Sequence, residues 1–223
     1  MKYLRRFADD QKNNSLANRF RRERFAWFRS MLGTVARPCR ILDVGGTELF
    51  WEQMGFIDET DVEVVLLNLS SVRVSRANFT SVAGDARDMR QFREQEFDVV
   101  FSNSVIEHVG DFDRQLKMAG EIMRVGKRYF VQTPNKHFPI EPHFLFPYFQ
   151  FLPVRVRVFL VRHFSLGWVD RTPDREAAGV LVRSVRLPSA SEMKKLFPQS
   201  TLYREKVLGL TKSFVAYGGW YTP

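Results

Sequence analysis

The stretch Arg40-Ile41-Leu42-Asp43-Val44-Gly45-Gly46-Thr47 decides the fold class. An apolar run, typical of a buried strand, ends in an acidic residue and is followed at once by two glycines. Glycine has no Cβ, so the backbone can turn sharply there and a small molecule can approach the main-chain amides. Taken alone, the stretch is compatible with the floor of a ligand-binding site or with an ordinary turn between a strand and a helix.

Strand and helix signals alternate after this stretch. Strands are expected at 40–44, 62–69, 80–83, 97–102 and 129–132, and helices at 48–55 and 111–126, with a short helix or turn at 71–78. Repeated strand–helix units indicate a parallel sheet with right-handed crossovers. The ends of these strands carry polar residues, which a parallel sheet gathers at one edge. They are Asp43, Asn68, Asp85, Ser102-Asn103 and Thr133-Asn135.

Two further segments are expected to flank this sheet within a single domain, residues 1–223. Residues 1–36 form an N-terminal helical cap, whose helix begins at an N-cap, Ser15, and ends at Gly33. Its apolar face comprises Leu16, Phe20, Trp27, Phe28, Met31 and Leu32. Residues 138–180 form an insertion or lid after the fifth strand.

Local signals within and after the insertion differ in clarity. Pro153 can start a helix, whereas the alternation Val-Arg-Val-Arg-Val favours a strand, and both remain open. Residues 170–180 are expected to form a mobile polar loop. Ser189 and Glu192 make a capping box before a short helix, and 202–210 and 213–217 suit a closing pair of strands.

Bulk properties restrict the function classes. The formal net charge of +9 permits nucleic acid or an anionic membrane surface as partners, but the basic residues are spread along the chain, which favours a solvated basic surface. Cys39 is the only cysteine, so no intrachain disulfide can form, and we expect a reducing, cytoplasmic location. No secretory signal or transmembrane run is recognisable, although arginines in the Phe-rich insertion leave peripheral membrane contact open. The oligomeric state is not indicated.

Three segments carry a resemblance to a known family: Ile41–Gly46, Ala83–Ala86 and the run Phe97–Val109, which contains Val-Ile-Glu-His. Over residues 38–135 the chain resembles the class I S-adenosylmethionine-dependent methyltransferases, of the small-molecule type that includes ubiquinone-biosynthesis-like enzymes. The resemblance implies a Rossmann-like α/β fold, doubly wound around a mostly parallel seven-stranded sheet with an antiparallel last strand. It also implies S-adenosyl-L-methionine as cofactor.

The resemblance further implies a role for each matching residue. Asp43, Gly45 and Gly46, with Thr47 next to them, would lie beside the methionine part of the cofactor. Asn68 would hold the ribose hydroxyls and Leu69 would lie against the adenine. Asp85, with Ala86 adjacent, would accept from the adenine amino group. Ser102 and Asn103 would line the floor under the sulfonium.

Two departures from the family pattern affect this site. The usual Gly-x-Gly-x-Gly turn is longer, whereas Thr47 directly follows the glycine pair here. Asn68 replaces the usual carboxylate, and an amide oxygen accepts from a hydroxyl without charge assistance. We therefore expect ordinary or somewhat weak cofactor affinity. Asn68 also counts against a nicotinamide-dependent dehydrogenase.

Methyl transfer to a hydroxyl benefits from a general base, and His108 is the candidate because histidine titrates near neutrality. It can equally be a helix-cap or cofactor-packing residue. Asn135, His137, Glu141 and His143 are expected to face the acceptor. With Glu107 or His108 they offer metal ligands, but their spacing matches no compact motif, so we predict no metal site.

The expected function is methyl transfer from S-adenosylmethionine to a small-molecule acceptor through an oxygen, nitrogen or carbon nucleophile. An RNA methyltransferase is an alternative, motivated by the basic N-terminal helix. Against it, Ser102-Asn103-Ser104-Val105 stands where base-amine methyltransferases often carry Asn-Pro-Pro-aromatic. A non-catalytic cofactor-binding module is the third hypothesis.

Overall fold

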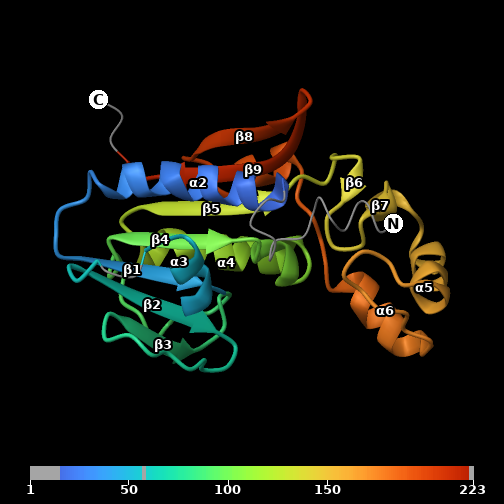
Figure 1. Ribbon diagram of the computed structural model, residues 1–223, viewed down its shortest axis with the longest axis horizontal. Helices are drawn as coiled ribbons and strands as arrows, with labels where there is room; N and C mark the ends of the chain where they lie inside the picture. The colour runs from blue at the N-terminus through green and yellow to red at the C-terminus, as the bar shows by residue number, and fades with distance from the viewer. Residues whose placement is uncertain (1–15, 57–58, 221–223) are drawn as a thin grey trace.

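The computed structural model describes residues 16–56 and 59–220 and contains a seven-stranded sheet (Figure 1). The strand order is β3-β2-β1-β4-β5-β9-β8. Neighbouring strands pair in parallel from β3 to β5, and β9 is antiparallel to both β5 and β8. The Rossmann-like fold with one antiparallel strand is therefore confirmed. The strands are β1 (Cys39–Val44), β2 (Val62–Asn68), β3 (Phe79–Ala83), β4 (Val99–Asn103), β5 (Tyr129–Pro134), β8 (Thr201–Val207) and β9 (Leu210–Gly218).

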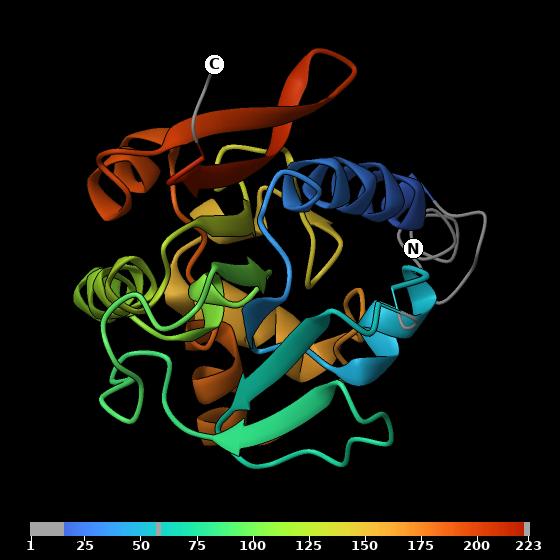
Figure 2. The ribbon, with the colours of Figure 1, turned by 90° about the vertical axis from the view of Figure 1, so that its left-hand side faces the viewer.

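Helices cover both faces of the sheet (Figure 2). On one face lie α2 (Leu16–Leu32) and α3 (Glu48–Gln53), and on the other lie α4 (Phe112–Val125) and α7 (Ala190–Leu196). The face under α2 is aromatic, since the Phe28 ring centroid lies 4.7 Å from that of Phe101 and 5.2 Å from that of Phe130. This core accounts for part of the chain's 21 phenylalanines.

The apolar face of α2 was predicted in outline. Phe28 and Leu32 are buried, and Phe25, which the predicted face omitted, is buried as well. Phe20 is only partly buried. Ser15, the expected N-cap, lies outside the described residues.

Two capping predictions in the rest of the chain are confirmed. Asp111 caps α4 by accepting from Arg114 N at 3.0 Å, and Ser189 forms a capping box with Glu192 before α7.

Of the short helix or turn expected at 71–78, the structure shows the turn, within an otherwise irregular connection between β2 and β3. One local prediction needs correction. Residues 170–180 are not a loop throughout, because α6 (Arg175–Arg183) occupies the second half. Asp174 caps α6 by accepting from Ala177 N at 2.7 Å, and Val182 is buried against the insertion.

The insertion lies beyond the carboxyl ends of the central strands (Figure 1). It contains β6 (Ile140–Glu141), β7 (Phe146–Pro147), the short 3-10 helix η2 (Phe149–Phe151), α5 (Val154–His163) and α6. Pro153 is the N-cap of α5, so the Val-Arg alternation forms a helix rather than a strand. In the described part of the chain, no helix combines the length and the hydropathy needed to cross a bilayer.

Candidate active site

The glycine turn after β1 requires both of its glycines. Gly45 has a φ of +78°, and a Cβ there would lie 2.5 Å from Val105 Cγ2. A Cβ on Gly46 would lie 1.6 Å from Asp43 Oδ2. The Asp43 side chain therefore packs directly on the turn, and only a residue without a side chain leaves room for this arrangement.

Asp43 is a buried carboxylate held by a tryptophan. Its Oδ2 accepts from Trp51 Nε1 at 2.7 Å, and 1% of the residue is exposed. Burial raises the pKa of Asp43 to about 7, although the Trp51 hydrogen bond opposes this rise. The site thus holds a carboxylate whose charge is poorly compensated by the protein itself, which favours a cationic ligand group nearby.

The predicted cofactor residues after β2 lie beside this turn, because Leu67 pairs with Val44 in the sheet. Asn68 Nδ2 donates to Gly46 O at 2.9 Å. The amide oxygen of Asn68 is thereby oriented as an acceptor for a hydroxyl. Leu69 is 82% exposed, so its apolar side chain is available to a planar ligand.

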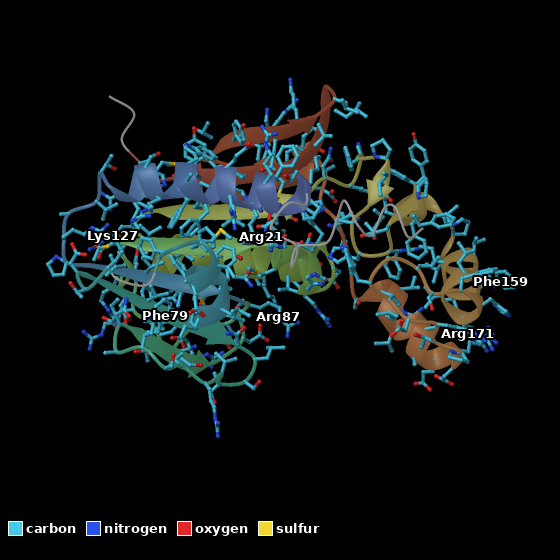
Figure 3. All side chains as sticks on the ribbon, viewed as in Figure 1. Arg21, Phe79, Arg87, Lys127, Phe159 and Arg171 are labelled. Carbon is cyan, nitrogen blue, oxygen red and sulfur yellow. The ribbon has the colours of Figure 1, made fainter. Side chains whose placement is uncertain are left out.

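Asp85, after β3, is engaged by its own loop. Its Oδ1 accepts from Arg87 N and Arg87 Nε, each at 2.9 Å, and its Oδ2 pairs with Arg87 Nη2 at 2.5 Å. Hydrogen bonds from Arg87 hold the pKa of Asp85 below its usual range. Figure 3 shows Arg87 toward the sheet edge that faces the insertion, whereas Lys127 lies at the opposite end. An adenine amino group at the expected position would share this carboxylate with Arg87.

The end of β4 is covered by the N-terminal helix. Arg24 Nη2 donates to Asn103 Oδ1 at 3.0 Å, and Arg24 Nη1 lies 3.1 Å from Glu205 Oε1 in a buried ion pair. Ser102 is buried and donates from Oγ to Val44 O at 3.3 Å. Through Arg24, α2 connects the fourth strand to the closing strand pair.

A chain of hydrogen bonds links the predicted base to the insertion. His143 Nδ1 lies 2.6 Å from Glu141 Oε1, and His143 Nε2 lies 3.2 Å from His108 Nε2. His108 ends the 3-10 helix η1 (Ile106–His108), which follows β4. Glu141 is held in place because its Oε2 accepts from Phe144 N at 2.6 Å.

The two histidines have opposite pKa shifts. Burial opposes protonation of His143, but the hydrogen bond and charge of Glu141 outweigh it, so the pKa of His143 is raised. Desolvation of the His108 ring by the surrounding chain, followed by the charge of His143, lowers the pKa of His108. The pair therefore favours a protonated His143 that donates to a neutral His108.

Glu107 is the fourth member of this cluster. It is fully buried, its Oε2 accepts from Thr133 Oγ1 at 2.9 Å, and its Oε1 has no hydrogen-bond partner. Burial raises its pKa to about 7. Ligand atoms of Glu107, His108 and His143 lie within 4.8 Å of one another, which is compact enough to hold a metal ion. The sequence predicts no metal site, and this stays a prediction.

The remaining predicted residues have other surroundings. Asn135 is buried and structural: its Nδ2 donates to Thr211 O at 2.8 Å and its Oδ1 accepts from His137 N at 3.0 Å. His137 is exposed, and its ring contacts Phe151 rather than the histidine pair. Thr47 is the N-cap of α3 and accepts from Phe50 N at 3.3 Å. Ala86 packs against the core on the α4 side.

Sequence reasoning did not identify Trp51 or Arg24 as parts of the site. Trp51 lies eight residues after Asp43, within the helix predicted at 48–55. A tryptophan N–H that follows a buried acid so closely in sequence was a usable signal. Arg24 had no such local signal, because its partners Asn103 and Glu205 come from distant parts of the sequence.

The geometry fits the expected cofactor at its methionine end and its ribose. Gly45 and Gly46 make a cradle that a Cβ would fill, and Asp43 offers a carboxylate to a cation. The Asn68 oxygen suits a ribose hydroxyl, whereas Asp85 is the one predicted contact that already has several donors.

Comparisons with known proteins agree with this geometry. Residues 42–130 match the family described as "Methyltransferase domain". A ubiquinone biosynthesis O-methyltransferase of Mesorhizobium japonicum is 32% identical over 115 residues, which cover 46% of this chain and 45% of that protein. An uncharacterised protein of Mycobacterium tuberculosis is 39% identical over 56 residues, which cover 25% of this chain and 19% of that protein.

The matched part thus spans less than half the length of these relatives. An S-adenosylmethionine-dependent methyltransferase of Methanosarcina mazei has a similar fold, with a TM-score of 0.50, 12% identity and coverage of 84% of this chain and 95% of that chain. Fold, glycine turn and sequence matches together support a class I S-adenosylmethionine-dependent methyltransferase domain in this chain, and proteins of that family use S-adenosylmethionine as cofactor.

Proposed function

We propose that the protein transfers a methyl group from S-adenosylmethionine to a hydroxyl group of a small-molecule acceptor. One observation carries the choice of a hydroxyl: His108 Nε2 lies 3.2 Å from His143 Nε2, and His143 is in turn held by Glu141. A hydroxyl must lose its proton on methylation, and a positioned base contributes about 10²–10⁴ in rate. Two imidazole nitrogens that converge on one point supply such a base.

The proton balance assigns a role to each histidine. An acceptor hydroxyl must first replace the direct hydrogen bond between the two rings, which requires them to move apart; it then donates to His108 Nε2 and accepts from His143 Nε2–H. The cofactor supplies the methyl group when bound. As the acceptor oxygen gains the methyl, its proton stays on His108, and Glu141 keeps His143 oriented. A neutral His108 is available for this task because its pKa is lowered.

The cofactor residues act by position. In this proposal Asp43 and the turn at Gly45 and Gly46 hold the methionine part, and Asn68 holds the ribose. Ser102 and Asn103 would line the floor below the sulfur of the bound cofactor. These assignments are supported by the cradle at Gly46 and by the register of β2, β1 and β4, which brings their carboxyl ends together.

The surroundings of α2 favour a small acceptor over RNA. Arg24 is buried against Glu205, and Arg29 lies 2.8 Å from Glu59. Arginines that are engaged in ion pairs within the protein contribute less to phosphate binding.

The first test measures cofactor binding by isothermal titration with S-adenosylhomocysteine, in the wild type and in Asp85→Ala. We expect binding by the wild type and weaker binding by the variant. The second test measures S-adenosylhomocysteine formation with a panel of phenols and other hydroxyl compounds.

His108→Asn should lose turnover while it retains cofactor binding, and His163→Asn, an exposed histidine on α5, is the matched control. Binding without turnover on any acceptor would favour the non-catalytic module instead.

A further inference from the structure

A polar cavity lies between the insertion and the segments that flank it. It has a volume of about 170 Å³ and lies between residues that precede β6, the helices α5 and α6, and the segment that follows α6. An apolar cavity of ~150 Å³ can accept a molecule as large as benzene, so this one has room for a single small group. Its wall includes Lys136, Gln150, Arg157 and Arg186 beside the rings of Phe144 and Phe149.

Two buried polar atoms in this wall lack hydrogen-bond partners. Among the described residues, three buried side-chain atoms are unpartnered, and two of them, Gln150 Oε1 and Arg157 Nε, belong to residues of this cavity. Leaving a buried polar atom unpaired costs about 1–3 kcal/mol, so such a pair in one wall points to a ligand or water that satisfies both.

The orientation of Gln150 is fixed by its neighbours. Its Nε2 donates to Lys136 O and Phe138 O, both at 2.8 Å. Since both partners are carbonyl oxygens, the nitrogen must face them and the oxygen must face elsewhere. Gln150 Oε1 thus offers an acceptor, which requires a hydroxyl or another donor from a ligand.

The positive charge of Arg157 is only partly compensated. Its Nη1 makes one long contact, 3.5 Å to Val182 O. Within residues 16–56 and 59–220, no carboxylate forms an ion pair with Arg157 or Lys136. Glu141 also lines the cavity, and its charge acts on Arg157, but both of its oxygens are hydrogen-bonded elsewhere, to His143 and to Phe144 N. Arg186 is already paired with Glu192 and Gln115.

We propose that this cavity binds an oxyanion, a carboxylate or phosphate group, that carries a neighbouring hydroxyl. Arg157 Nε–H and the Lys136 ammonium bind the anion, Gln150 Oε1 accepts from the hydroxyl, and the stacked rings of Phe144 and Phe149, 4.1 Å apart, form the apolar wall. Glu141 separates the cavity from His143, so the site adjoins the histidine pair. We assign the bound oxyanion to the acidic end of the methyl acceptor. This assignment rests on the proposed function, whereas the binding of an anion does not.

The experiment follows the Arg157 Nε–Hε signal by nitrogen–proton NMR of the full chain. Its probes are glycerate, inorganic phosphate, glycerol, and chloride at matched ionic strength. Glycerate and phosphate should shift the signal with affinities in the millimolar range, whereas glycerol and chloride should not. Arg157→Gln, followed through backbone amides of the same segment, should weaken binding of both anions at least about tenfold.

Arg155→Gln is the matched control, because Arg155 is exposed two residues away on α5 and carries the same charge. The absence of a shift with either anion would overturn the proposal, as would equal binding by the two variants. Arg157→Gln removes an unpaired buried donor, so the variant should fold. Its melting temperature checks this. Lys136→Gln provides a second variant at the anion site. Titration of the same samples with S-adenosylhomocysteine keeps the outcomes apart: its loss would contradict the proposed function and leave the anion shift standing.

Discussion

His143 Nε2 lies 3.2 Å from His108 Nε2. Two imidazole lone pairs cannot face each other at that distance, so one proton must lie between the nitrogens. The proton resides on His143, because the Glu141 carboxylate stabilises the imidazolium through Nδ1. His108 is therefore the basic member of the pair, and an acceptor hydroxyl that reaches its Nε2 replaces the hydrogen bond from His143.

Substitutions along the hydrogen-bonded series His108, His143 and Glu141 should lower turnover to different extents. His108→Asn removes the base and should lower kcat by about 10²–10⁴, with the affinity for S-adenosylhomocysteine unchanged. Glu141→Gln retains a hydrogen-bonding group but not the charge, so the loss should be smaller. It should also move the alkaline limb of the pH–rate profile to lower pH, because His143, which must stay protonated, loses the carboxylate that raises its pKa. If Glu141→Gln lowered kcat as much as His108→Asn and left the pH–rate profile unchanged, Glu141 would serve only the local fold.

Metal removal distinguishes a base from a metal ligand at the same residues. The proton-transfer proposal predicts that dialysis against a chelator leaves turnover unchanged, because His108 and His143 then act without an ion. Metal content of the purified protein should be measured alongside. If activity disappears and returns on addition of a divalent cation, Glu107, His108 and His143 hold a metal and the base assignment is wrong.

Much of the fold was predictable because its signals are local. The apolar run before Asp43, the glycine pair and the Ser189 capping box act within a few residues of sequence. The polarity of 170–180 predicts a loop, although Asp174 is an N-cap whose helix becomes evident only when Val182 packs against the core of the insertion. Tertiary burial decided that segment.

The candidate site was predictable only in part, for the same reason. His108, Glu141 and His143 were each identified as polar residues after a strand, but their mutual contact depends on how the insertion returns to η1. Arg186 N donates to Glu107 O at 2.8 Å at that point. Arg24 lies on a helix face that suggests a solvated charge, and its burial depends on Glu205, 181 residues later.

Cofactor affinity should depend on pH through Asp43. Burial raises its pKa to about 7, so the ionised form is disfavoured in the free protein. Because the unfolded chain ionises this carboxyl more easily, the free energy of unfolding of the free protein falls as pH rises from about 4 to 7. A cationic ligand group favours the ionised form. Binding of S-adenosylhomocysteine should therefore weaken below pH ~7, by up to about tenfold per pH unit.

Titration calorimetry between pH ~6 and ~8 tests this dependence. Asp43→Asn is the control, because its amide oxygen can still accept from Trp51 Nε1 while it carries no titratable charge. Binding by this variant should be weaker and nearly independent of pH. A pH dependence that persists in Asp43→Asn would assign it to another group.

The close packing of Asp43 on Gly46 gives a sharper test of the turn. In Gly46→Ala the added Cβ would lie 1.6 Å from Asp43 Oδ2, so the carboxylate must move and its bond to Trp51 must break. We expect a loss of about 1–3 kcal/mol in the free energy of unfolding, together with weaker binding of S-adenosylhomocysteine. Gly120→Ala is the control: Gly120 lies within α4, its Cβ would meet nothing within 4 Å, and the change should stabilise the helix by up to about 1 kcal/mol. Denaturant unfolding and calorimetry of both variants provide the comparison. If Gly46→Ala were as stable as Gly120→Ala and bound the cofactor product normally, Asp43 would not be held against the turn, and its role in positioning the methionine part of the cofactor would have to be abandoned.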